Sequence, residues 1–95
     1  MPTYSLEFLP SALKEWDRLG ATVRDQLKKK LKERLNAPEI RSAQLRGAPD
    51  LYKIKLRKSG YRLVYRVDQG RLVVVVISVG KRDKSRVYRS ATKRK

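Results

Sequence analysis

The chain has 95 residues, 40% of them hydrophobic, which suits one small domain with a single core. It carries 25 lysines and arginines against 9 acidic residues, for a net charge of +16. The absence of cysteine and histidine excludes disulfides, Cys/His zinc sites, thiol nucleophiles and Ser–His couples. No cofactor or metal is expected.

The positive charge is concentrated in the second part of the chain. Residues 1–40 hold eight basic and six acidic side chains, whereas residues 41–95 hold seventeen basic and three acidic ones. Such a field attracts phosphates and predicts a polyanionic partner. The longest apolar run, 72–77, is far too short to span a membrane, and the first residues lack a secretion leader. We therefore expect a cytoplasmic protein without a membrane role.

The first half of the sequence predicts a strand and two helices. Alternation of apolar and polar residues indicates a strand at 3–8. A short helix is expected from Pro10 to just before Gly20, and a longer one follows it. The apolar stripe of the longer helix recurs every four residues, at Val23, Leu27, Leu31 and Leu35. The lysines around this stripe are expected to be its solvated face.

The second half predicts three strands after a loop at 37–50. Residues 51–57 and 61–67 alternate, whereas 72–79 is almost wholly apolar and should be a central strand covered on both faces. The rest is a short polar C-terminal segment, with Val87 and Tyr88 as candidates for tethering it. The sequence thus predicts a single α+β domain over residues 1–95, with two N-terminal helices packed on one face of a small antiparallel sheet.

The turn between the strands at 51–57 and 61–67 decides where the basic side chains lie. A two-residue turn of Ser59 and Gly60 separates basic from apolar side chains, whereas a three-residue turn would mix charges into the core at a high cost. The shorter turn therefore predicts one apolar face toward the helices and one cationic face. The basic side chains on that cationic face are Lys53, Lys55, Arg57, Arg62 and Arg66.

A cationic sheet face could bind RNA or cleave it. For binding, Lys and Arg neutralise phosphates while Tyr52, Tyr61 or Tyr88 stack on bases. For cleavage, the RNA 2′-OH attacks the adjacent phosphate, which requires a base, charge compensation and a proton for the leaving oxygen. Like charges lower a lysine pKa, so Lys53 or Lys55 could be the base. The residues alone leave both readings open.

Several segments resemble the RelE toxins of bacterial toxin–antitoxin pairs, across nearly the whole chain and in the same order. They are ALKEWDRLGATVRDQLKKKL, LRGAPD, LYKIKLRKSGYRLVYRV and ISVGKRDKSRVY. The resemblance implies a fold similar to microbial ribonucleases. It also implies cleavage of mRNA in the ribosomal A site, with 2′,3′-cyclic or 3′-phosphate and 5′-OH products. A RelB-type antitoxin would neutralise the toxin, and the complex would repress its own operon through the antitoxin's contact with operator DNA.

The resemblance also implies roles for individual residues. The family's active positions fall on Lys53, Lys55, Arg62, Arg82 and Tyr88, with Arg46 in support. Either lysine would be the base, Arg62 would brace the phosphate, Arg82 would assist the leaving oxygen and Tyr88 would stack on a base or orient the nucleotide. Contacts to RNA or the ribosome are expected from Arg46, Arg57, Arg66 and Lys81.

Two other functions fit the same composition. The chain could be a non-catalytic module that binds RNA or the ribosome, with the basic face as its docking surface. It could also act only as an antitoxin-bound corepressor, in which case expression of the chain alone would not inhibit growth. A steep salt dependence of RNA binding is expected in all three cases and distinguishes none of them.

Overall fold

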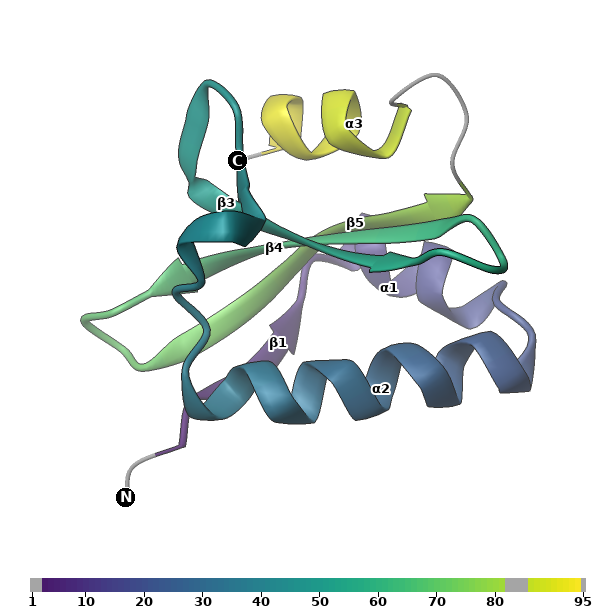
Figure 1. The fold of residues 1–95 in the computed structure, drawn as a ribbon, viewed down its shortest axis with the longest axis horizontal. Coiled ribbons are helices and arrows are strands. Elements are labelled where there is room, and N and C mark those ends of the chain that lie inside the picture. The colour runs from purple at the N-terminus through teal and green to yellow at the C-terminus, as the bar shows by residue number, and fades with distance from the viewer. Residues whose placement is uncertain (1–2, 82–85, 95) are drawn as a thin grey trace.

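The structure is a computed structural model that describes residues 3–81 and 86–94, with the backbone alone at 86, 87 and 90. A five-stranded sheet lies between two layers of helix (Figure 1). The elements in chain order are β1 (Ser5–Phe8), α1 (Pro10–Asp17), α2 (Ala21–Asn36), the 3₁₀ turn η1 (Arg41–Ala43), β2 (Gln44–Leu45), β3 (Ala48–Leu56), β4 (Tyr61–Asp68), β5 (Val73–Lys81) and α3 (Arg86–Arg94). None of these helices is long and apolar enough to cross a membrane.

The α+β class is confirmed, but the expected purely antiparallel sheet is wrong. The strand order is β1-β5-β4-β3-β2, and β1 pairs with β5 in parallel, with Ser5 opposite Val73. Strand β5 is buried along almost its whole length, so it requires a neighbour on both edges. Strand β1 provides the second neighbour, and the long connection through α1 and α2 is what a parallel pair requires. The sheet is therefore mixed.

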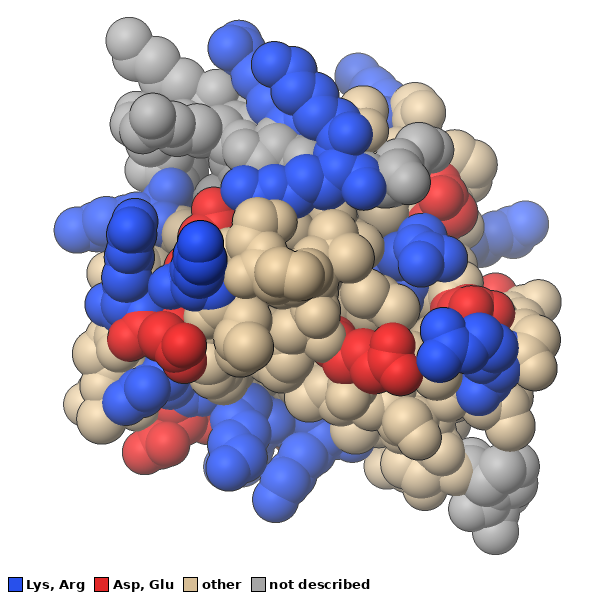
Figure 2. All heavy atoms as spheres, turned by 180° about the vertical axis from the view of Figure 1, so that it is seen from behind, with Lys and Arg blue, Asp and Glu red and all other residues tan. Residues whose placement is uncertain are grey.

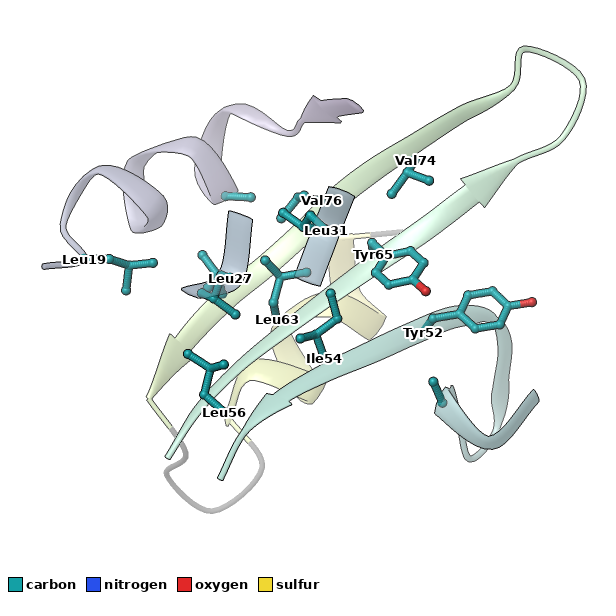
Figure 3. Close-up of a cluster of buried hydrophobic side chains, with 13 residues drawn as sticks. Leu19, Leu27, Leu31, Tyr52, Ile54, Leu56, Leu63, Tyr65, Val74 and Val76 are labelled. Atoms are coloured by element: carbon teal, nitrogen blue, oxygen red, sulfur yellow. The ribbon is translucent and has the colours of Figure 1, made fainter. Parts of the chain in front are cut away.

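The main core lies between the sheet and helices α1 and α2 (Figure 3). Leu27 and Leu31 of α2 are buried against Ile54 and Leu63 of the sheet. The helical period of four and the strand period of two bring these apolar positions to one interface. The ring of Tyr52 stacks on that of Tyr65, with the ring centroids 5.5 Å apart. Tyr52 is thus a core residue and cannot serve as the base-stacking side chain that the sequence suggested.

Helix α3 covers the other face of the sheet, which is only partly cationic. Beneath this helix lies a second apolar cluster that includes Leu51, Val64, Ile77 and Ala91. The expected wholly cationic face is therefore wrong, because β5 presents valine and isoleucine side chains to both faces. Arg94, near the end of α3, donates to both carboxylate oxygens of Glu15 on α1, at 2.9 and 3.2 Å, and to the Ile77 carbonyl oxygen at 3.0 Å.

The β3–β4 turn is longer than expected. Leu56 pairs with Tyr61 and Lys55 with Arg62, so four residues, 57–60, form the turn. The Gly60 amide closes it by donating to the Leu56 carbonyl oxygen at 2.8 Å, and Gly60 adopts a φ of 79°, which favours glycine. The predicted pairing is wrong by two residues. The sorting of side chains between faces is nevertheless correct, because a shift of two preserves it.

The expected loop at 37–50 is also more ordered than predicted. It contains η1, β2 and the first residues of β3. Gly47 adopts a φ of 79° in the tight turn that joins β2 to β3. This turn makes β2 the edge strand of the sheet and places Arg46 beside it.

Alkaline pH is expected to destabilise the fold through Tyr65. Burial raises the pKa of this phenol, and the hydrogen bond from Arg34 offsets the rise in part. The folded state therefore keeps the proton at a pH where the unfolded chain releases it. Stability should fall as the pH rises above about 10, with a slope of up to about 1.4 kcal/mol per pH unit. Urea unfolding of the wild type and of Tyr65→Phe between pH 8 and 11 measures this loss. If the difference in the free energy of unfolding between the two proteins does not change with pH, the prediction is wrong.

Candidate functional site

A cavity of about 550 Å³ lies between the β2–β3 turn, strand β3 and helix α3. It brings together three of the predicted residues, Arg46, Lys53 and Tyr88, which lie far apart in the sequence. The lining residues are Leu45, Arg46, Lys53, Tyr88, Arg89, Thr92 and Lys93. This lining carries four cationic side chains and no carboxylate, so it attracts anions such as phosphate.

Each predicted residue in the cavity is positioned by a different element. The β2–β3 turn carries Arg46, which is exposed. Lys53 is half-buried and lies at a β3 position opposite Val64, on the sheet face that α3 covers. Tyr88 enters from α3, which is anchored by the fully buried Ala91 and by Arg94. The cavity is therefore formed by side chains from three elements, the β2–β3 turn, β3 and α3.

Tyr88 has a polar atom without a protein partner. Its ring packs against the cluster beneath α3, and its hydroxyl is buried but has no hydrogen-bond partner among the described residues. A buried hydroxyl without a partner costs free energy, and a bound polar ligand would relieve that cost. Tyr88 therefore packs on the apolar cluster, as expected of a tether, and also contributes to the lining of the cavity. The side chain of Val87, the other predicted tether, is outside the described residues.

Arg34 on α2 supports Lys53 from the opposite side of the sheet. Its Nη1 donates to the Lys53 carbonyl oxygen at 3.2 Å and to the Tyr65 hydroxyl at 2.9 Å. The Tyr65 hydroxyl in turn donates to the Pro38 carbonyl oxygen at 2.7 Å. This network fixes the β3 backbone at the position of Lys53. Sequence reasoning missed Arg34, since on a helix with many basic residues nothing distinguishes an inward-reaching arginine from solvated ones.

The structure separates the other predicted residues from this cavity. Lys55 and Arg57 line a second hollow, of about 690 Å³, between α2 and the β3–β4 turn. Arg62 lies opposite Lys55 in the sheet and donates to the Tyr61 carbonyl oxygen at 3.0 Å. Lys81 is exposed at the end of β5. The two predicted lysines thus lie on one strand but line different hollows.

Two further predicted residues lie outside the cavity for different reasons. Arg66 lines a third hollow, of about 450 Å³, together with the carboxylates of Glu39, Asp50 and Asp68. These acids make that hollow a poor site for phosphate. Arg82, the predicted partner of the leaving oxygen, lies outside the residues that the structure describes.

The face opposite to that of Figure 1 carries charges of both signs. The view from behind shows acidic side chains around an apolar centre, with lysines and arginines on every side of them (Figure 2). Within the described part of the chain, no three acidic side chains cluster in a way that could hold a metal ion. The arrangement is suited to binding polyanions at its edges.

Comparison with known families assigns the chain to a class. A model of the ParE toxin of the parDE type II toxin–antitoxin system matches residues 6–86. This match covers α1, α2 and the sheet except for the first residue of β1, and it includes only the first residue of α3. The chain therefore belongs to the RelE/ParE family of toxins from type II toxin–antitoxin systems.

Within this family the chain is similar to RelE. It is 63% identical over 91 residues to the mRNA interferase toxin RelE of Escherichia coli K12, covering 96% of both chains. A free-state structure of an E. coli RelE variant with two arginine-to-alanine substitutions shares 60% identity at a TM-score of 0.90, covering 98% of both chains. The intact E. coli RelBE toxin–antitoxin complex contains a chain with 62% identity and a TM-score of 0.81; the match covers 85% of the present chain and 99% of that one.

Proposed function

We propose that this protein is a ribosome-dependent endoribonuclease that cleaves mRNA in the ribosomal A site and so inhibits translation. The observation that carries the proposal is the cavity lined by four cations and no carboxylate, with Lys53 and Tyr88 inside it. The relatives named mRNA interferase support it through 63% identity over 96% of the chain.

The proposed reaction is an internal transfer at phosphorus. A lysine, either Lys53 or Lys55, takes the proton of the RNA 2′-OH, and the O2′–P bond forms. The P–O5′ bond breaks, and the leaving 5′-oxygen takes a proton from Arg82, the residue expected to assist it, which gives a 2′,3′-cyclic phosphate and a 5′-OH. Water can then open the cyclic phosphate to a 3′-phosphate. If Lys53 is the base, Arg46 beside it compensates the charge on the phosphorane, and if Lys55 is the base, Arg62 opposite it does so. Arginine suits this role because it keeps its proton and binds phosphate through two N–H groups.

The requirement for the ribosome follows from the residues available. The chain has no histidine and the cavity lining holds no carboxylate, so we expect proton transfer by lysine and arginine, whose ordinary pKa values lie far above neutral pH. Such a pair is a weak acid–base couple. A ribosome that holds the mRNA in an attack-ready geometry supplies the missing rate, since positioning alone can contribute about 7–11 kcal/mol.

A RelB-type antitoxin is the proposed protein partner. The E. coli relative is described in a complex with RelB, and its chain matches this one at a TM-score of 0.81. We propose that the antitoxin neutralises this toxin, and that the complex represses its own operon with the antitoxin contacting the operator DNA. The toxin itself would act in the cytoplasm, where ribosomes and mRNA are found.

The test is a primer-extension map of an mRNA on programmed 70S ribosomes with an empty A site, beside the same mRNA free in solution. A new 5′ end inside the A-site codon, formed only with ribosomes and protein, is the expected result. Equal cleavage of free mRNA would refute the ribosome requirement. Absence of cleavage with the protein still bound to ribosomes would favour the non-catalytic module.

A further inference from the structure

Strand β5 loses one of its two neighbouring strands halfway along. Strand β1 pairs with β5 only from Val73 to Val76, and the Leu9 amide then donates to the Val76 carbonyl oxygen at 3.0 Å. Strand β5 continues to Lys81, so in the described part of the chain its second half has no strand beside it on this edge. Such an edge leaves backbone polar groups without partners and invites pairing with other chains.

A bulge in β5 lies where β1 ends. Ser78 and Val76 pair with adjacent residues of β4, so Ile77 between them is an extra residue without a partner on that strand. Such an insertion bends the strand and interrupts the regular ladder of hydrogen bonds. The backbone at this point therefore needs hydrogen-bond partners other than a strand.

An ion pair between two helices supplies those partners. The Glu15 carboxylate of α1 accepts a hydrogen bond from the Val79 amide at 3.2 Å. The Arg94 guanidinium of α3 donates to the Ile77 carbonyl oxygen at 3.0 Å. The guanidinium and the carboxylate also bind each other through two hydrogen bonds, at 2.9 and 3.2 Å, and both side chains are partly shielded from water. This pair takes the place of a strand at the free part of the β5 edge.

Helix α3 depends on the pair because few other contacts hold it. The helix has nine residues, a length that is marginal without tertiary contacts. Among its described side chains Ala91 alone is buried, and Tyr88 is partly buried against the same cluster. Helices α1 and α3 lie on opposite faces of the sheet, so the pair ties α3 around the sheet edge to α1 (Figure 1). The position of α3 in turn shapes the cavity, since α3 supplies four of its seven lining residues.

We propose that Glu15 and Arg94 are positioning residues, which close the free edge of β5 and hold α3 where its side chains complete the cavity. Neither residue lines the cavity, so both act through Tyr88 and the other cavity residues of α3. This rests on the proposed function, since the cavity is the proposed site of cleavage. Because the seating of α3 can be measured without any cleavage, the two proposals can fail separately.

The first test compares two ion pairs by amide hydrogen exchange, followed by NMR. Arg94→Ala breaks the pair at the β5 edge, whereas Arg71→Ala breaks the exposed pair of Arg71 with Glu7 of β1. Arg94→Ala should accelerate exchange of the Ala91 amide in α3 about 10-fold or more, because hydrogen bonds between charged groups are the strong ones. Arg71→Ala should leave this rate at the wild-type value.

A variant of the other partner gives an independent readout. Glu15→Ala should accelerate exchange at Ala91 to a similar extent, because it breaks the same pair. It should also accelerate exchange at Val79, because this amide loses its acceptor. Neither Glu15 nor Arg94 belongs to the main core, so both variants are expected to fold.

Cleavage on programmed ribosomes then tests the positioning role. Arg94→Ala and Glu15→Ala should each lower kcat about 10-fold and leave KM unchanged, because a misplaced α3 disturbs the geometry of reaction while the cavity keeps its cations. Combining the two substitutions should add little, since each already breaks the pair. Arg71→Ala should keep the wild-type kcat.

Each outcome decides one part of the proposal. Unchanged exchange at Ala91 in Arg94→Ala would show that the pair does not hold α3. Faster exchange with an unchanged kcat would make the pair purely structural, and an equal effect of Arg71→Ala would assign the change to overall charge. If the wild type cuts nothing on ribosomes, the proposed activity fails and the positioning role fails with it, while the exchange rates still decide whether the pair holds α3.

Discussion

Replacement of Lys53 by alanine is expected to reduce A-site cleavage by about 10²–10³-fold, the usual cost of removing one group that stabilises developing charge in a reaction. Lys53 is half-buried in the cavity beside α3, next to Arg46 and Tyr88. Its β3 backbone is fixed by Arg34 and by pairing with Val64, so the fold should survive the change. Single-turnover cleavage on programmed ribosomes, with a thermal melt of each protein, measures both effects.

Two further sets of variants give this prediction its controls. Lys14→Ala removes an exposed lysine on α1 that lines none of the three hollows, and it should cleave at the wild-type rate. Arginine keeps its charge but cannot act as a base near neutral pH. If Lys53→Arg loses as much activity as Lys53→Ala, Lys53 is the base. The same comparison of Lys55→Arg with Lys55→Ala tests Lys55. Full activity of Lys53→Ala would remove the cavity from the mechanism.

Truncation of the Leu31 side chain to alanine is expected to destabilise the fold strongly. This α2 side chain is 1% exposed and packs in the main core, so Leu31→Ala should reduce the free energy of unfolding by about 2–5 kcal/mol. A domain of this kind has a total of about 5–15 kcal/mol. Leu13→Ala is the matched control, because Leu13 on α1 is 44% exposed and its loss should cost about 0.5 kcal/mol or less.

Urea unfolding curves of the two leucine variants beside the wild type give both values. A similar loss for the two would mean that the layer formed by α1 and α2 does not pack as the structure shows. A large loss for Leu31→Ala alone also shows that the stripe of apolar residues on α2 faces the sheet, as the period of four in the sequence predicted.

The sequence predicted which face of the sheet each side chain occupies better than it predicted which residues pair across neighbouring strands. Residues on each side of β3 and β4 were sorted correctly because the pattern repeats every two residues, and a pairing error of two leaves it unchanged. Whether Arg57 or Lys55 lies opposite Arg62 depends on turn length, which the four polar or small residues of the turn do not specify. The predicted Arg57–Arg62 pair therefore failed, while Lys53 and Lys55 were placed on the correct face.

Long-range contacts were the part that the sequence could not predict. Nothing in β1 indicates that it joins β5 in parallel, since a four-residue strand carries no directional pattern. The segment 86–94 is mostly polar, and Tyr88 was expected as a tether, but the contacts of Ala91 with the second apolar cluster and of Arg94 with Glu15 were not predicted. For the same reason Arg89, Thr92 and Lys93 were not predicted as cavity residues, because their role exists only once α3 lies beside Lys53.

The position of α3 has a consequence for how the toxin is made. Four of the seven residues that line the cavity belong to this helix, whereas both apolar clusters draw most of their members from residues before it. A growing chain that has reached β5 already contains the whole sheet and helices α1 and α2, but it lacks more than half of the cavity. The cavity is thus completed only after α3 has been synthesised, so a nascent chain that stops at β5 cannot assemble it.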